Sequence, residues 1–133
     1  MDRYLISLHP QWYAKILEGT KTEEFRSRAP KCGVPFAVLA HKTGTDIASL
    51  AFVVDSVRDC ETEWGGVAWH IKPGSVSEVG PFSLAEIVKA GTGRPVKSWP
   101  QMYARIEVAD VPNFRISPTA ENTTLSTDRK SVV

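Results

Sequence analysis

Hydrophobic and polar positions change their spacing several times along the chain, and each change marks a predicted element. Residues 4–9 are rich in Leu and Ile and predict a short strand. In residues 10–18 the apolar side chains recur at helical spacing and are expected to bury one face of a helix: Trp12, Tyr13, Ile16 and Leu17. Pro10 suits the first helical position with His9 as the cap residue, and Gly19 is typical of the residue that ends a helix.

Residues 21–28 carry a dense run of charge, yet their pattern favours a strand. Thr22, Phe25 and the preceding Gly19 all weaken a helical interpretation. Strand alternation divides the segment into two faces: Glu24, Arg26 and Arg28 on one, and Glu23, Phe25 and Ser27 on the other.

The clearest strands are residues 36–41 and 47–57, joined by a glycine-containing segment that fits a hairpin. Their nearly continuous apolar character indicates the centre of a closed or heavily covered sheet. One short strand is predicted at 67–71 between loops, and a last one at 101–108.

A second short helix is predicted after Ser83, because Ser83 and Glu86 form a capping box. Leu84, Ile87 and Val88 would make its buried stripe, and Gly91 would end it. The order of elements favours an α+β fold, a small mixed β-barrel with short flanking helices, over a parallel α/β sheet. We expect one domain over residues 1–116 and a disordered, Ser- and Thr-rich tail over 117–133.

Composition excludes few functions. The 133 residues carry a net charge of +1, so binding to a polyanion would need a local patch. No segment has the pattern of a signal peptide or a membrane span, and the two cysteines, Cys32 and Cys60, are interpreted as reduced thiols. These features predict a cytoplasmic protein with no cofactor.

Isolated histidines and tryptophans add little. His9, His41 and His70 lack the spacing of metal ligands, so no metal site is predicted. Trp12 is assigned to the core and Trp99 to the end of the barrel. Trp64 and Trp69 flank a glycine-rich loop, and one of them, preferably Trp69, is expected to contact a ligand by stacking.

The stretch "ILEGTKTEEFR" resembles the opening of the ASCH family (activating signal cointegrator homology), a relative of the PUA-like barrels. That family follows a short helix ending I-L-x-G with a strand beginning K-T-x-E-x-R. The matching positions in this chain are Ile16, Leu17, Gly19, Lys21, Thr22, Glu24 and Arg26.

The resemblance implies a cleft lined by the motif and a ligand that is RNA, single-stranded nucleic acid or a nucleotide-like molecule. Lys21 would meet phosphate, Glu24 would order the cleft or accept a hydrogen bond from a base, and Arg26 would clamp or stack. Five basic residues and two acids in residues 21–42 give this region a local charge of +3. Further contacts are expected from four side chains: Ser7, His9, Thr22 and Arg28.

Two alternatives stay open. The first is a hydrolase of the same fold, acting on single-stranded RNA or a modified nucleoside, with Lys21 and Glu24 as acid–base groups. One branch of the family is an amidohydrolase whose nucleophile is a threonine three residues after the motif lysine; here that position is Glu24. The second is a protein-interaction module whose charged strand contacts a partner protein. From the residues alone, the charged strand is equally compatible with a face that is exposed to solvent. The oligomeric state is not predicted.

Overall fold

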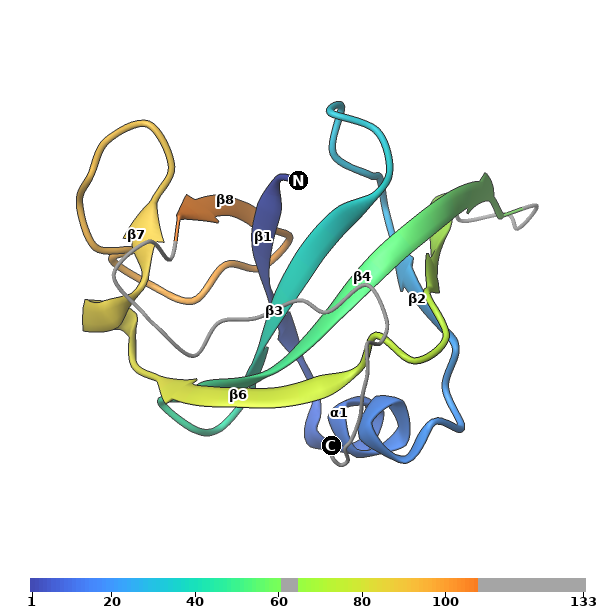
Figure 1. Cartoon of the computed structure of the whole chain (residues 1–133), viewed down its shortest axis with the longest axis horizontal. Coiled ribbons are helices and arrows are strands. Elements are labelled where there is room, and N and C mark those ends of the chain that lie inside the picture. The colour runs from blue at the N-terminus through green and yellow to red at the C-terminus, as the bar shows by residue number, and fades with distance from the viewer. Residues whose placement is uncertain (61–64, 108–133) are drawn as a thin grey trace.

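The computed structural model describes residues 1–60 and 65–107, whose strands form one strongly curved sheet (Figure 1). The elements are β1 (Arg3–Leu8), α1 (Pro10–Glu18), β2 (Glu23–Arg26), β3 (Phe36–Lys42), β4 (Ala48–Asp59), β5 (Val67–Ile71), β6 (Ser77–Phe82), a 3-10 turn (Leu84–Glu86), β7 (Val88–Lys89) and β8 (Ala104–Glu107). The expected tail and Trp64 lie outside the described residues.

The strands follow the order β2-β5-β4-β3-β1-β8-β7, and β6 adds a third partner to β4, beside β5 and β3. β1 and β3 are parallel, whereas the other pairs are antiparallel. Within the described residues no strand pairing joins β2 to β7, so the sheet is open at both ends. A mostly-sheet fold with one short helix is thus observed, and the predicted closed barrel is not confirmed.

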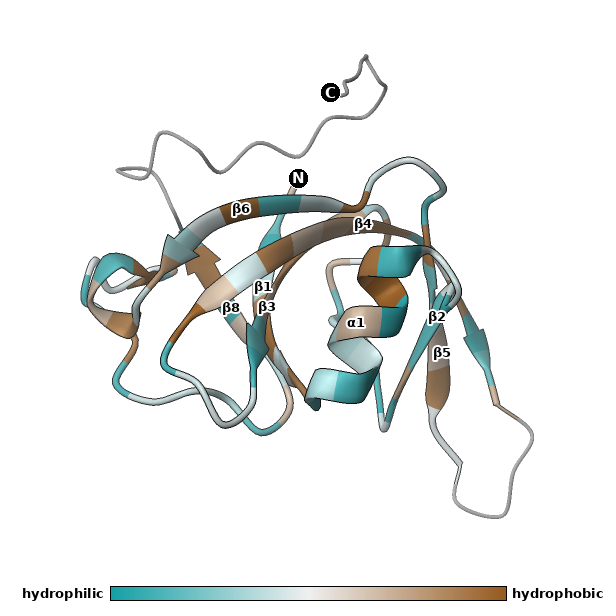
Figure 2. Cartoon of the chain, turned by 90° about the horizontal axis from the view of Figure 1, so that it is seen from below, coloured by the Kyte–Doolittle hydropathy of each residue, from teal (hydrophilic) through white to brown (hydrophobic). Residues whose placement is uncertain are grey.

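Strand alternation builds a hydrophobic core on each side of the sheet. On β1, Tyr4 and Ile6 belong to one cluster and Leu5 to the other, and β3 divides in the same way. The first cluster is covered by Tyr13 and Ile16 of α1, which lies in the hollow of the curved sheet (Figure 2). The second collects apolar residues of β6, the 84–96 region and β8: Val79, Phe82, Ile87, Val96 and Ile106. The curvature therefore places α1 beside β2.

Helix α1 begins at Pro10 and ends at Gly19 (φ 87°), as the sequence predicts. His9 occupies the cap position, but its side chain makes no capping hydrogen bond. The buried stripe is narrower than predicted, because Trp12 and Leu17 are 39% and 42% exposed. The assignment of Trp12 to the core is wrong: the helix of two and a half turns buries only Tyr13 and Ile16 against the sheet, and Trp12 lies on another face of the helix.

The second helix is also a wrong prediction. The Glu86 carboxylate does accept a hydrogen bond from the Ser83 backbone N–H (2.9 Å), but the turn stops there. Ile87 is extended (φ −103°, ψ 122°), fully buried, and accepts a backbone hydrogen bond from Val96. Strand-type pairing and burial in the second core override the local helical pattern. β6 was not predicted, because its segment "SEVGPF" contains glycine and proline.

The structure describes no helix that combines the length and the apolar character needed to cross a membrane.

Candidate functional site

Lys21, Glu24 and Arg26 meet where the chain leaves α1 and enters β2. The Lys21 Nζ lies 3.5 Å from Glu24 Oε1, and the Arg26 Nε lies 2.9 Å from Glu24 Oε2. The three side chains are only 14%, 9% and 10% exposed. Glu24 and Arg26 share the inner face of β2, as alternation predicts, and the carboxylate links the two cations.

The Arg26 guanidinium is committed to partners within the protein. Its Nη2 donates to the Ser7 carbonyl (2.8 Å) and its Nη1 to the Met102 carbonyl (3.2 Å). β2 stands four places from β1 in the strand order, so these bonds join two arms of the curved sheet that no ladder connects. Arg26 therefore holds Glu24 in place and bridges the open side of the fold.

The Lys21 ammonium, in contrast, lies near solvent-exposed rings. Its Nζ is 5.1 Å from the centroid of Trp12 and 5.2 Å from that of Phe25, which is 57% exposed. Lys21 also lines a hollow of about 270 Å³ together with Thr22, His70 and Lys72. Two lysines and a hydroxyl around one hollow form an arrangement that suits a phosphate group.

His70 and Lys72 line this hollow and are not among the ligand residues that the sequence predicts. The His70 Nδ1 lies 2.7 Å from Asp55 Oδ1, and the His70 and Asp55 side chains are 39% and 36% exposed. This contact orients the imidazole and leaves Nε2 as the second ring nitrogen for a ligand or a proton. Asp55 lies at an irregularity in the β4–β5 register, between the pairs of Val54 and Ser56, which no local pattern indicates.

The remaining predicted ligand residues are spread over several places. Thr22 lines the hollow with Lys21, whereas Arg28 is exposed and its Nε donates to Met102 Sδ (3.2 Å). His9 is exposed at the start of α1. The Ser7 hydroxyl contacts the Pro100 carbonyl (2.9 Å) and His41 Nδ1 (3.0 Å), and it belongs to the face of β1 that carries Leu5.

Trp69 is misplaced by the sequence analysis. It lies within β5 opposite Glu24, not in a flexible loop, and is fully buried. Its ring packs edge-on against Phe36 (centroids 5.1 Å apart) in the first core. A ring enclosed in this way offers no face for stacking on a base, and the exposed rings beside Lys21 belong to Trp12 and Phe25 instead. Trp99 stacks on His41 (3.9 Å) and packs against the second core.

Over residues 1–60 and 65–107, no three His, Cys, Asp or Glu side chains gather closely enough to hold a metal ion. Both cysteines, Cys32 and Cys60, are free.

Glu23, on the outer face of β2, gives a pH prediction. Two hydrogen bonds from the Arg58 guanidinium (3.0 and 2.9 Å) hold the pKa of the Glu23 carboxyl below its usual value. The pair therefore stabilises the fold above the usual glutamate pKa of about 4.3, and this contribution is lost as the pH falls through the lowered value. Arg58→Gln should raise the Glu23 pKa in a carbon-detected NMR titration. Arg28→Gln is the control, and an equal response to both would contradict the assignment.

Comparison with solved structures relates the fold of this chain to known proteins. A crystal structure of an ASCH protein variant from Zymomonas mobilis, with one tyrosine changed to phenylalanine, superposes with a TM-score of 0.60 at 16% identity. The match covers 80% of this chain and 91% of that one. The chain has the ASCH-domain fold.

A crystal structure of ASCH from the same organism agrees, with a TM-score of 0.57 at 16% identity over 79% of this chain and 87% of that one. No family model and no curated protein sequence matches the chain. The ASCH-domain fold is thus recognised from shape, and the resemblance of the "ILEGTKTEEFR" stretch is confirmed at the level of fold.

Proposed function

We propose that the protein binds single-stranded RNA, or a nucleotide-like ligand, at the hollow between the end of α1 and the start of β2. The observation that carries this proposal is the placement of the Lys21 ammonium beside two exposed aromatic rings and at the edge of the hollow. Alternating cations and rings suit a single strand, because phosphates pair with ammonium groups while unpaired bases stack.

Each residue has a distinct role in this proposal. Lys21 and Lys72 contact phosphate, and the Thr22 hydroxyl adds a hydrogen bond. Glu24 holds the Lys21 ammonium toward the hollow and offers its oxygens to base amino groups. Arg26 supports the site by fixing Glu24, and Phe25 supplies the stacking surface.

The test compares a fluorescent RNA of about ten nucleotides as a single strand and as a duplex, using fluorescence anisotropy at several salt concentrations. We expect tighter binding of the single strand and a shallow salt dependence. Each phosphate contact contributes a slope of about −0.7, so two lysines give about −1.4. Absence of single-strand binding, or a preference for the duplex, would contradict the proposal.

The stacking role has its own variant. Phe25→Ala should weaken single-strand binding about 5- to 100-fold, which corresponds to the loss of one base stacked on an aromatic ring. Val34→Ala is the matched control, because Val34 is another exposed apolar residue (45%) away from this strand. If both variants bind RNA equally well, Phe25 is not part of the site.

The Asp55–His70 pair specifically favours a second candidate function, hydrolysis of RNA at the same hollow. In that case His70 Nε2 takes a proton from an attacking water, whose oxygen bonds to phosphorus while the P–O bond to the next nucleotide breaks. The protonated His70 then gives the proton to the leaving oxygen, Asp55 keeps the imidazole oriented, and Lys21 stabilises the charge that develops on the phosphate. Cleaved RNA would accumulate with the wild type, and His70→Gln would abolish cleavage while binding persists. A protein-interaction module predicts neither RNA cleavage nor RNA binding. Its partner would be a protein, which would remain bound after nuclease treatment.

A further inference from the structure

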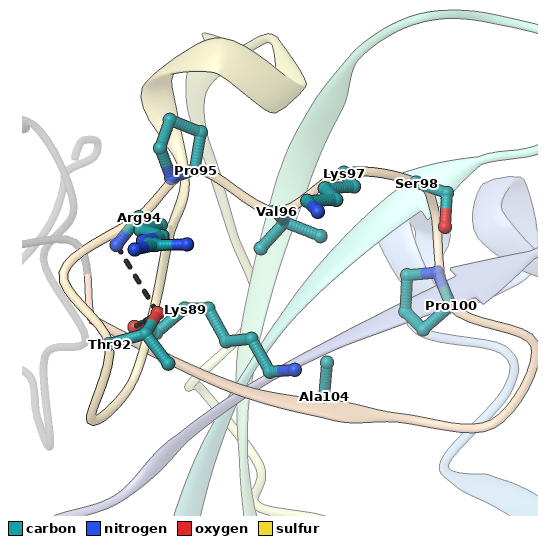
Figure 3. A pocket seen from close by; sticks show the side chains of 9 residues that line it. All are labelled: Lys89, Thr92, Arg94, Pro95, Val96, Lys97, Ser98, Pro100 and Ala104. Atoms are coloured by element: carbon teal, nitrogen blue, oxygen red, sulfur yellow. Dashed lines mark hydrogen bonds between the residues drawn. The ribbon is translucent and has the colours of Figure 1, made fainter.

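A second and larger hollow, of about 680 Å³, lies between the loop that follows β7, residues 95–100 and the start of β8 (Figure 3). Three cationic side chains line it: Lys89, Arg94 and Lys97. Thr92 and Ser98 add hydroxyl groups. It shares no lining residue with the hollow at Lys21, so the two are separate sites.

The backbone of residues 87–96 places two of these cations opposite each other. The Lys89 N–H donates to the Arg94 carbonyl (2.8 Å), and the Val96 N–H donates to the Ile87 carbonyl (2.9 Å). Thr92 tightens the loop, because its Oγ accepts a hydrogen bond from the Arg94 N–H (3.2 Å). Lys89 and Arg94 are therefore held close together by the same backbone pairing that replaced the expected second helix.

Among the described residues, the charges of this hollow are unbalanced. Over residues 1–60 and 65–107 no carboxylate lines it, and none of its three cations forms an ion pair. Like charges gathered in one place raise the local positive potential and attract anions. Val96, Pro95 and Pro100 form apolar walls, which strengthen electrostatic attraction inside the hollow.

We propose that this hollow binds a chain of two or three linked phosphates, as carried by a nucleoside di- or triphosphate. A single phosphate dianion would leave part of the charge of three cations unbalanced, whereas linked phosphates match it. The Ser98 hydroxyl donates a further hydrogen bond, whereas the Thr92 hydroxyl donates to the Lys89 carbonyl (3.3 Å) and shapes the loop; the apolar walls receive the nucleoside. The volume lies within the range of about 300–1,000 Å³ that is usual for small-molecule sites.

Isothermal titration calorimetry with the full chain tests the proposal, using inorganic tripolyphosphate, adenosine triphosphate and adenosine monophosphate. We expect tripolyphosphate and the triphosphate to bind and the monophosphate to bind at least about tenfold more weakly. The difference in affinity between tripolyphosphate and adenosine triphosphate measures the contribution of the nucleoside, which contacts the apolar walls.

Variants locate the binding. Arg94→Gln and Lys97→Gln should each weaken triphosphate binding about fivefold, the effect of one partly exposed charge pair, and roughly 25-fold together. Lys15→Gln and Lys31→Gln remove the same charge from exposed lysines elsewhere and should leave the affinity unchanged. Inorganic tripolyphosphate should still bind to the Lys21→Gln variant, and Arg94→Gln in that background should weaken it about fivefold again, which separates this site from the hollow at Lys21.

Four results would overturn the proposal. The first three are no heat of binding for either polyphosphate, equal losses in the target and control variants, and a monophosphate that binds as tightly as the triphosphate. The fourth is binding of single-stranded RNA that depends on Arg94 and Lys97 in the absence of triphosphate binding, because the hollow would then hold a nucleic-acid backbone.

Discussion

Replacing Arg26 with alanine should destabilise the fold by about 3–5 kcal/mol, the usual cost of removing one partner from a buried ion pair. The reason is that Glu24 would remain as a carboxylate with only 9% of its side chain exposed. The variant also loses the guanidinium hydrogen bonds to the carbonyls of Ser7 and Met102, which join β2 to the opposite arm of the sheet.

Chemical denaturation measures this effect, with Arg28→Ala as the control, since Arg28 is exposed two residues further along the chain. The control should change the free energy of unfolding by less than about 0.5 kcal/mol. Arg26→Lys should fall between them, because an ammonium keeps the charge beside Glu24 but cannot also reach the Ser7 and Met102 carbonyls as a planar guanidinium does.

A second substitution checks the cause. Adding Glu24→Gln to Arg26→Ala removes a buried carboxylate that has lost its closer partner and keeps the longer Lys21 contact (3.5 Å), and it should recover part of the lost stability. The bridging role of Arg26 is wrong if Arg26→Ala is no more destabilised than Arg28→Ala. It is also wrong if the double variant has a lower free energy of unfolding than Arg26→Ala alone. Ligand affinities of Arg26 variants should be corrected for the fraction of folded protein, because unfolding alone would reduce binding.

The parts of the fold that could be predicted from the sequence depend on contacts between near neighbours. Helix α1 has its proline at one end and Gly19 at the other, and its buried Tyr13 and Ile16 lie one turn apart. In β2 the alternation of side chains was enough to bring Glu24 and Arg26 to one face. Local rules apply to these elements because tertiary contacts do not oppose them.

The failures have a common cause in long-range pairing. The segment after Ser83 has a good helical start, but its backbone bonds to Val96 and to β8 hold it extended. Trp69 falls within the strand predicted at 67–71, but its ring is expected beside a glycine-rich loop and open to a ligand, whereas β2 and β4 enclose it from both sides. Such contacts depend on which strands become neighbours, and that information is spread over the whole chain.

The site was predicted only in part for the same reason. The charges of Lys21, Glu24 and Arg26 stand within six residues, so their meeting follows from a single strand. His70 and Asp55 reach each other through the β4–β5 register, which shifts between Val54 and Ser56. The structure also separates the roles of the motif cations: Arg26 is occupied by carbonyls and a carboxylate, and Lys21 reaches the hollow.

That separation makes Lys21→Gln the variant with the largest expected effect on binding. Its affinity for single-stranded RNA should fall about 10- to 100-fold, because a charge-assisted hydrogen bond at a largely buried group contributes about 1.5–3 kcal/mol. The Lys21 side chain is only 14% exposed, so solvent screens its charge weakly. The salt dependence should become shallower by one phosphate contact.

Lys15→Gln is the matched control, since it removes an exposed lysine from α1 without changing the hollow. Lys21→Gln should remain folded with nearly unchanged stability, because Glu24 keeps Arg26 as its closer partner, at 2.9 Å compared with 3.5 Å. Gel analysis of the RNA after each titration shows whether it stays intact, which separates binding from hydrolysis. An RNA affinity equal to that of Lys15→Gln would remove Lys21 from the site, and with it the main support for a ligand at this end of the sheet.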